Sequence, residues 1–169
     1  DSIAKADNQI YWIGDDLQVY RMAGFQPQPI STESIVRRIE ARSSPQTAVG
    51  FTYQQDGHTH YVLTFSDLTL SYDVNTGLWH QRISDGMERW RVSCHVWMPS
   101  WRRHIVGDCE TGALYTLDTE AHNEAGAVLR RRAIGAPLFW AGQRARVDEF
   151  FLDMQAGVGP EAGTAPQAV

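Results

Sequence analysis

Residues 48–83 read AVGFTYQQDGHTHYVLTFSDLTLSYDVNTGLWHQRI, and this stretch decides the fold class. Apolar, β-branched and aromatic residues recur at alternate places in short runs, which is the pattern of strands. The predicted strands are residues 48–54, 60–65, 68–74 and 78–83. Asp56-Gly57 and Asn75-Thr76-Gly77 are strong turn signals between them. The stretch therefore predicts a four-stranded antiparallel meander, the size of one propeller blade.

The same pattern recurs on both sides of this stretch. Further strands are predicted at residues 9–13, 17–22, 92–98, 103–106 and 113–117. Each unit places a tyrosine in its third strand, Tyr20, Tyr72 and Tyr115. The tyrosines are spaced by about 40–50 residues, the period of propeller repeats. The sequence therefore predicts an all-β, propeller-like protein built from antiparallel meanders.

One short helix interrupts the strands, near residues 32–41. Ser31 or Thr32 can cap its first exposed amides, because both carry a hydroxyl just before the helix. Ile35 and Ile39 lie one turn apart and predict a buried face.

The length limits how much of a propeller the chain can build. Propellers have four to eight blades, and at roughly 45 residues per blade a chain of 169 residues holds fewer than four. We therefore expect a partial propeller or a fragment of a larger protein. The propeller-like segment is expected to cover residues 1–154 and to end in a strand over 147–154. Residues 155–169 are rich in Ala, Gly and Pro and are expected to form a flexible or truncated tail.

The charge and hydropathy exclude several classes of protein. The formal net charge is −5, which disfavours tight DNA binding because DNA-binding surfaces are usually basic. No apolar run approaches the roughly 18 residues that a membrane span needs.

A docking surface is predicted from clustered arginines and from tryptophans beside loops. The candidate residues are Arg102, Arg103, Arg130, Arg131, Arg132, Trp90 and Trp101. The arginines are either ordinary solvated surface residues or a patch for an acidic partner or a phosphate. Trp12, Trp79 and Trp97 lie inside predicted strands and are expected in the core.

The sequence contains no recognised catalytic or cofactor-binding motif. The motifs of metalloproteases, serine hydrolases and nucleotide-binding loops are missing, so we expect no enzyme, no metal and no cofactor. His58 and His60 are interpreted as polar residues at a hairpin end, and the acidic residues at turns as turn formers. Cys94 and Cys109 are expected to be buried free thiols in neighbouring strands, although a disulfide stays open.

Several ordered segments resemble a known family, the packaged-DNA stabilisation proteins of short-tailed phages and prophages. The similar segments are Ile3–Asn8, Ile30–Thr32, Phe51–Thr59, Tyr61–Phe65, Tyr72-Asp73, Thr76–His80, Cys94-His95, Val106–Asp108, Thr111–Tyr115, Asp118 and Phe151–Gly159. Together they span nearly the whole chain in the family's order.

This resemblance implies a structural protein of the virion, made in the cytoplasm of the bacterial host. It implies a place in the tail or portal-vertex assembly, where the protein helps to attach the tail and to close the portal channel over packaged DNA. The implied partners are the portal or other tail proteins, in several copies, with neither catalytic residues nor cofactors.

Two alternatives stay open at this point. One is a carbohydrate-binding or glycoside-active propeller domain, because exposed tryptophans can stack on sugars and paired carboxylates can hydrolyse them. The other is a bacterial kelch-like module for protein interaction, without a phage context.

Overall fold

The computed structural model describes residues 1–129, 131–135, 142, 146, 149 and 151. The chain divides into two compact units, Asp1–Glu120 and Ala121–Val169, which are described separately. The predicted tail over 155–169 lies outside the described residues. So does the predicted strand over 147–154, apart from Glu149 and Phe151.

The first unit contains three antiparallel meanders. The first sheet consists of β1 (Ala4–Ala6), β2 (Gln9–Ile13), β3 (Val19–Ala23) and β4 (Gln26–Pro29) in sequence order. The middle sheet consists of β5 (Val49–Gln55), β6 (His58–Thr64), β7 (Thr69–Asp73) and β8 (Leu78–Gln81) in sequence order. The third sheet consists of β9 (Val92–Met98), β10 (Arg103–Asp108) and β11 (Leu114–Leu117). The predicted all-β, propeller-like fold of meanders with one short helix is confirmed.

The first sheet is more complete than the sequence predicted. We expected two strands, and the structure adds β1 and β4. β1 has only three residues, too few for a visible alternation. β4 contains Pro27 and Pro29, which cannot donate a backbone hydrogen bond and which normally argue against a strand. Both prolines are tolerated because β4 lies at the edge of the sheet, where, among the described residues, β3 is its one neighbour.

The helix α1 (Glu33–Glu40) lies between the first two sheets in sequence. Its N-cap is Thr32, whose hydroxyl accepts a hydrogen bond from the Ile35 amide at 3.4 Å. The other predicted cap, Ser31, instead accepts a bond from the Val19 amide of β3 at 3.0 Å. Ile35 and Ile39 are buried as predicted, and this packing stabilises a helix too short to be stable alone.

The middle sheet is covered on both faces. The core between it, the first sheet and α1 contains Tyr11, Val19, Ile35, Ile39, Ala48, Tyr61, Leu63, Phe65, Leu68, Leu70 and Tyr72. The core between it and the third sheet contains Tyr53, Val62, Trp90, Val92 and Val106, with Phe51, Tyr115 and Leu117 packed against them. Successive residues of β6 point to alternate cores, because side chains alternate along a strand.

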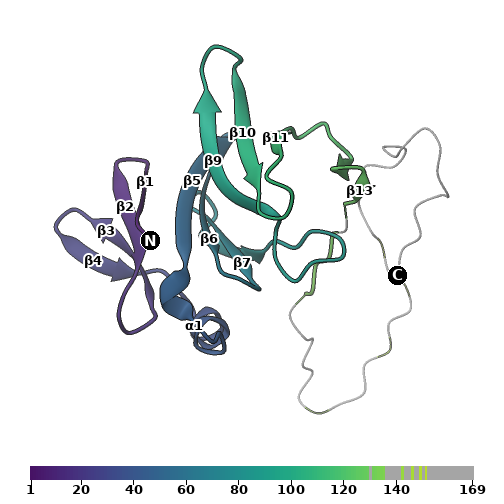
Figure 1. Ribbon diagram of the computed structural model, residues 1–169. Coiled ribbons are helices and arrows are strands. Elements are labelled where there is room, and N and C mark those ends of the chain that lie inside the picture. The colour runs from purple at the N-terminus through teal and green to yellow at the C-terminus, as the bar shows by residue number, and fades with distance from the viewer. Residues whose placement is uncertain (130, 136–141, 143–145, 147–148, 150, 152–169) are drawn as a thin grey trace. The chain divides into compact units, whose positions relative to one another are not determined.

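The first strands of the three sheets lie next to one another. β1 contacts β5, and β5 contacts β9 (Figure 1). Thr52 of β5 donates its hydroxyl proton to the Lys5 carbonyl of β1 at 2.8 Å. The start of β5 also lies close to the N-terminal residues. A Cβ on Gly50 would lie 2.1 Å from the Ser2 carbonyl oxygen, so only glycine fits there. Adjacent first strands are the arrangement expected of propeller blades around an axis.

The second unit is described over fewer residues. β12 (Asn123–Glu124) and β13 (Ala127–Val128) form a small hairpin. Ala125 and Gly126 make its turn, with positive φ angles of 51° and 85°. Among the described residues no helix has the length and apolar character needed to cross a membrane.

The two-sided burial of the middle sheet can be tested with matched substitutions. Leu63 is fully buried and Leu78 is 58% exposed, although both lie in the same sheet. Leu63→Ala is expected to lower the free energy of unfolding by about 2–5 kcal/mol, because it leaves a cavity in the core. Leu78→Ala is expected to change it by less than about 0.5 kcal/mol, as surface substitutions do. Urea unfolding followed by circular dichroism measures both; equal losses would contradict the described packing.

Candidate docking site

The hairpin between β9 and β10 presents exposed aromatic and basic side chains at its end. We call Trp97, Trp101, Arg102 and Arg103 the hairpin tip. Trp101 is 65% exposed and Trp97 is 45% exposed, and both arginines are exposed. Tryptophan and arginine are, with tyrosine, the residue types enriched at the energetic centres of protein interfaces.

The turn that carries the tip is well defined. The Trp101 amide donates to the Met98 carbonyl at 3.2 Å, and the Arg102 amide donates to the Pro99 carbonyl at 3.2 Å. Arg102 has a φ of 51°, a left-handed conformation that L residues adopt at a cost. The chain therefore holds an arginine at a position that glycine would occupy with less strain.

The predicted docking residues do not all meet at this tip. Trp101, Arg102 and Arg103 lie there. Trp90 does not: it is only 7% exposed, packs in the core between the middle and third sheets, and has the Arg82 guanidinium 4.7 Å from its ring. The prediction of an exposed Trp90 was therefore wrong, because a loop position says nothing of what packs over it.

The remaining predicted residues belong to the second unit. Arg131 and Arg132 are exposed, and Arg130 lies outside the described residues. The sequence also misplaced Trp97, which was expected in the core and is exposed instead. Of the other two expected core tryptophans, Trp79 packs against the first core and Trp12 is half-buried.

Histidine and aromatic rings support the base of the tip. The Trp97 and His104 rings lie 4.5 Å apart, and His104 Nδ1 lies 2.9 Å from His95 Nε2. His95 packs against Tyr53 of β5, and Tyr53 packs against His60 of β6. This row of rings joins the third sheet to the middle sheet, and sequence reasoning missed it because the residues come from four different strands.

The partly buried histidines of this row favour the neutral form. Burial, with help from the Arg82 guanidinium, lowers the pKa of His60 to about 4. Burial and the neighbouring His104 lower the pKa of His95 to about 4. Burial also lowers the pKa of His104, although Asp56 partly opposes this. Charging these rings at low pH therefore costs stability.

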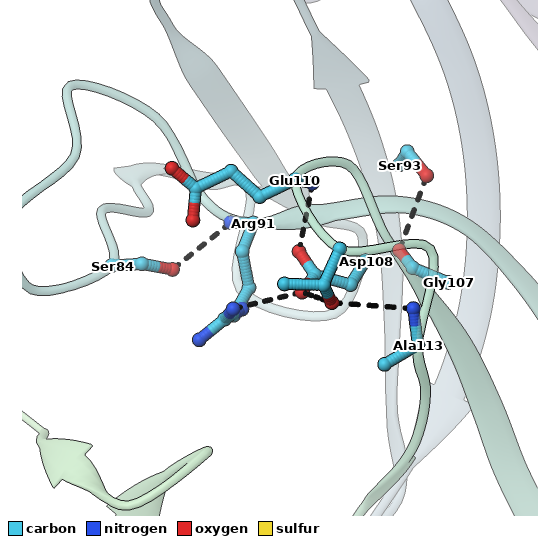
Figure 2. A network of polar contacts seen from close by, with 8 residues as sticks. Ser84, Arg91, Ser93, Gly107, Asp108, Glu110 and Ala113 are labelled. Carbon is cyan, nitrogen blue, oxygen red and sulfur yellow. Dashed lines mark hydrogen bonds and ion pairs between the residues drawn. The ribbon is translucent and has the colours of Figure 1, made fainter.

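Two turns share one chemical device, the sequence Asp-x-x-Thr-Gly. In the turn after β10, Asp108 Oδ1 accepts from the Glu110 amide at 3.1 Å, and Asp108 Oδ2 accepts from the Thr111 hydroxyl at 2.5 Å. Asp108 Oδ2 also lies 2.8 Å from an Arg91 guanidinium nitrogen, while the Arg91 amide donates to the Ser84 hydroxyl (Figure 2).

The turn between β7 and β8 repeats this arrangement. Asp73 accepts from the Asn75 amide and from the Thr76 hydroxyl, at 2.9 and 2.8 Å. His58 takes the place of the arginine, with its Nδ1 2.8 Å from Asp73 Oδ2. Gly77 and Gly112 close the two turns with positive φ angles of 72° and 69°.

These bonds keep both carboxylates ionised. Burial opposes ionisation of Asp73, but hydrogen bonds from Thr76, His58 and the Asn75 amide outweigh it and lower its pKa to about 2. The Arg91 guanidinium and the Thr111 hydroxyl hold the pKa of Asp108 well below its usual range. Carboxylates committed to turns in this way are poorly suited to act as general acids.

The expected burial of the two cysteines was wrong. Both are free, but Cys94 on β9 and Cys109 after β10 are exposed where burial was predicted. In the described part of the chain no three His, Cys, Asp or Glu side chains converge as metal ligands. His58 is instead bound to Asp73, in keeping with its interpretation as a hairpin-end residue.

Comparison with known protein families identifies a similarity over most of the chain. A family model described as Bacteriophage P22 Gp10, beta-propeller, matches residues 1–122, which is more than half of the chain. The match includes all three sheets of the first unit and therefore the whole hairpin tip. No curated protein matches the chain at the significance required.

The neutral histidines predict a loss of stability in weak acid. A histidine in the unfolded chain has a pKa of about 6.5, above the folded values of His60 and His95. Their contribution is complete above pH 6.5 and is lost as the pH falls toward 4, because the unfolded chain then binds more protons. Urea unfolding between pH 7.5 and 4 measures this fall. His95→Gln is expected to make it shallower, whereas the exposed His122→Gln leaves it unchanged.

The Asp108 turn is expected to matter more than an exposed turn of similar type. Asp108→Asn removes the charge that faces the largely buried Arg91, and an uncompensated buried charge is destabilising. Asp118→Asn is the matched control, because Asp118 also accepts an amide bond, from Glu120, but on the surface. The melting temperature is expected to fall clearly for the first variant and little for the second. Equal melting temperatures would show that the ion pair contributes nothing.

Proposed function

The chain belongs to the phage stabilisation family described as Bacteriophage P22 Gp10, beta-propeller, and we propose that it serves at the tail or portal vertex of the virion. There it would help to attach the tail and to close the portal channel over packaged DNA. Membership in this family makes it a phage structural protein of the DNA-stabilisation class. The observation that carries the proposal is the match over residues 1–122.

The proposed mechanism is binding by a rigid block. Three sheets joined through two cores hold the hairpin tip in a fixed position, so that little conformational freedom is lost when it docks. Trp101 would fill a pocket on the partner, and Arg102 would pair with a carboxylate. The proposed partner is therefore an acidic surface of the portal or of another tail protein, contacted by several copies of the chain.

The charge supports a role beside DNA without capture of DNA. The chain has a formal net charge of −5, and a surface of this sign repels the phosphate backbone. This charge is compatible with a protein that closes a channel without binding the DNA tightly.

A glycoside-active function finds less support. Asp73 and Asp108 are bound within their turns, and the exposed Trp97 and Trp101 are the one observation that favours binding of a sugar. The same two side chains serve an interface with a protein equally well.

The docking proposal can be tested on the tip itself. Arg102→Gly removes the guanidinium and suits the left-handed backbone at this position, so the hairpin is expected to stay folded. Trp101→Ala removes the most exposed tip aromatic. Each is expected to weaken binding to purified portal rings by about tenfold or more, as truncation of interface hot spots does.

The control is Phe25→Ala, because Phe25 is fully exposed in the turn between β3 and β4, away from the tip. Surface plasmon resonance with immobilised portal rings from the same phage measures all four proteins. Binding unaffected by both tip substitutions would rule out the tip as the docking site. Absence of binding by the unmodified chain would contradict the portal-vertex role.

A further inference from the structure

One face of the middle sheet buries polar atoms that have no hydrogen-bond partner. They include His60 Nδ1 on β6 and Ser71 Oγ on β7, and Ser71 is fully buried. Both lie on the face toward the third sheet, because Ser71 pairs with Val62, which belongs to the core on that side and lies two residues after His60. A buried polar group without a partner costs free energy, so a bound group that pairs with both atoms would be stabilised here.

The side chain of Arg82 crosses the sheet on this same face. Arg82 follows β8, and its amide donates to the Thr69 carbonyl of β7 at 3.0 Å. Its guanidinium carbon lies 5.4 Å from the centre of the Tyr53 ring on β5, and Tyr53 pairs with His60. Because the strand order is β5-β6-β7-β8, the side chain passes over the two strands that carry Ser71 and His60.

Aromatic rings hold the guanidinium of Arg82 in place. Its central carbon lies 4.7 Å from the Trp90 ring as well as near the Tyr53 ring, which is a cation–π arrangement on two rings. Both rings are buried. A cation fixed in this way loses little conformational freedom when it binds a ligand.

The positive charge of Arg82 is not balanced by a carboxylate. Among the described residues, Arg82 takes part in no ion pair. Asp73 lies nearby, but its oxygens already accept bonds within the β7–β8 turn. Arg82 lowers the pKa of His60 more than Asp73 raises it, and the neighbouring His58 and His80 lower it further. The surroundings of His60 therefore favour a negative group.

We propose that Arg82, His60 and Ser71 bind an oxyanion, that is, a phosphate, sulfate or carboxylate group. A guanidinium can donate two parallel N–H bonds to such a group. The Ser71 hydroxyl and the His60 ring can each donate one more. His80 lies opposite Ser71 on the edge strand β8 and is exposed, so a small ligand reaches the cluster from that edge.

The oxyanion site goes beyond the virion role and is independent of it. It lies on the middle sheet, whereas the docking proposal concerns the hairpin tip of the third sheet. A chain that binds no oxyanion would leave the family membership and the portal experiment untouched. Conversely, a chain that fails to bind portal rings can still bind an oxyanion.

The test is titration calorimetry of the full chain with sodium sulfate, against sodium chloride at the same ionic strength. Sulfate is expected to bind with a dissociation constant of about 1 mM or tighter. Ser71→Ala and Arg82→Gln are each expected to weaken this affinity by about tenfold or more, because each removes a donor. Arg37→Gln is the control: it removes one positive charge from an exposed side chain of α1 and is expected to leave the affinity unchanged.

The Ser71 variant separates binding from folding. Ser71→Ala removes a hydroxyl without a partner, so the unliganded variant is expected to be as stable as the parent chain. Thermal unfolding without sulfate checks this. With sulfate, the melting temperature of the parent chain is expected to rise, because the ligand binds the folded state, and that of the variant to rise less.

Two further measurements identify the ligand and the place. Titrations with inorganic phosphate and with acetate show whether the site prefers a tetrahedral anion or a carboxylate, and either preference supports an oxyanion site. Nuclear magnetic resonance of the histidine rings is expected to show sulfate-dependent shifts for His60 and none for the exposed His122. The proposal is overturned if none of the three anions binds, if both site variants bind sulfate as the parent chain does, or if the His60 signals do not move.

Discussion

Burial of strand β6 on both of its faces is the constraint on which the rest of the structure depends. Tyr61 and Leu63 enter one core while Val62, between them, enters the other. A shift of one residue in the pairing would exchange the two faces, so the registers with β5 and β7 are fixed by burial as well as by the turns. Each core is completed by a further sheet, and the helix α1 also packs on the core between the first and middle sheets. The stack of three sheets follows from the need to cover this one strand twice.

The same arrangement explains why function resides at edges, turns and outward faces. Side chains that build the cores are unavailable for partners, and this includes Trp90, whose amide donates to the Thr69 hydroxyl inside the protein. Accessible side chains lie, among other places, at the end of the β9–β10 hairpin and on the outward faces of the first and third sheets. A structural protein of a virion needs surfaces of this kind, held rigidly, more than it needs a pocket.

The sequence predicted elements well where a local pattern was sufficient and failed where burial depended on distant residues. The four strands of residues 48–83, the Thr32 or Ser31 cap and the buried Ile35 and Ile39 all follow from periodicity and turn chemistry within a few residues. The exposure of Trp97, Cys94 and Cys109 does not follow from local pattern: Cys94 lies on the outward face of β9, Trp97 lies at the end of its strand, and Cys109 lies in the turn after β10. The row of rings from His60 to His104 joins residues about 40 positions apart, for which a single sequence carries no signal. At the candidate site, the residue types were therefore predictable and their grouping was not.

The two Asp-x-x-Thr-Gly turns show how a repeated motif can mislead about the register of repeats. One turn joins the third and fourth strands of the middle sheet, whereas the other joins the second and third strands described for the third sheet. Their hydrogen bonds from the backbone amide and the threonine hydroxyl are nevertheless the same, and only the further side chain bound to the carboxylate differs, His58 in one and Arg91 in the other. The motif thus forms a tight turn, held by the aspartate side chain, at two different positions within a sheet. Tyr20, Tyr72 and Tyr115 all lie on third strands, so the tyrosine reports the position within a sheet more faithfully than the turn does.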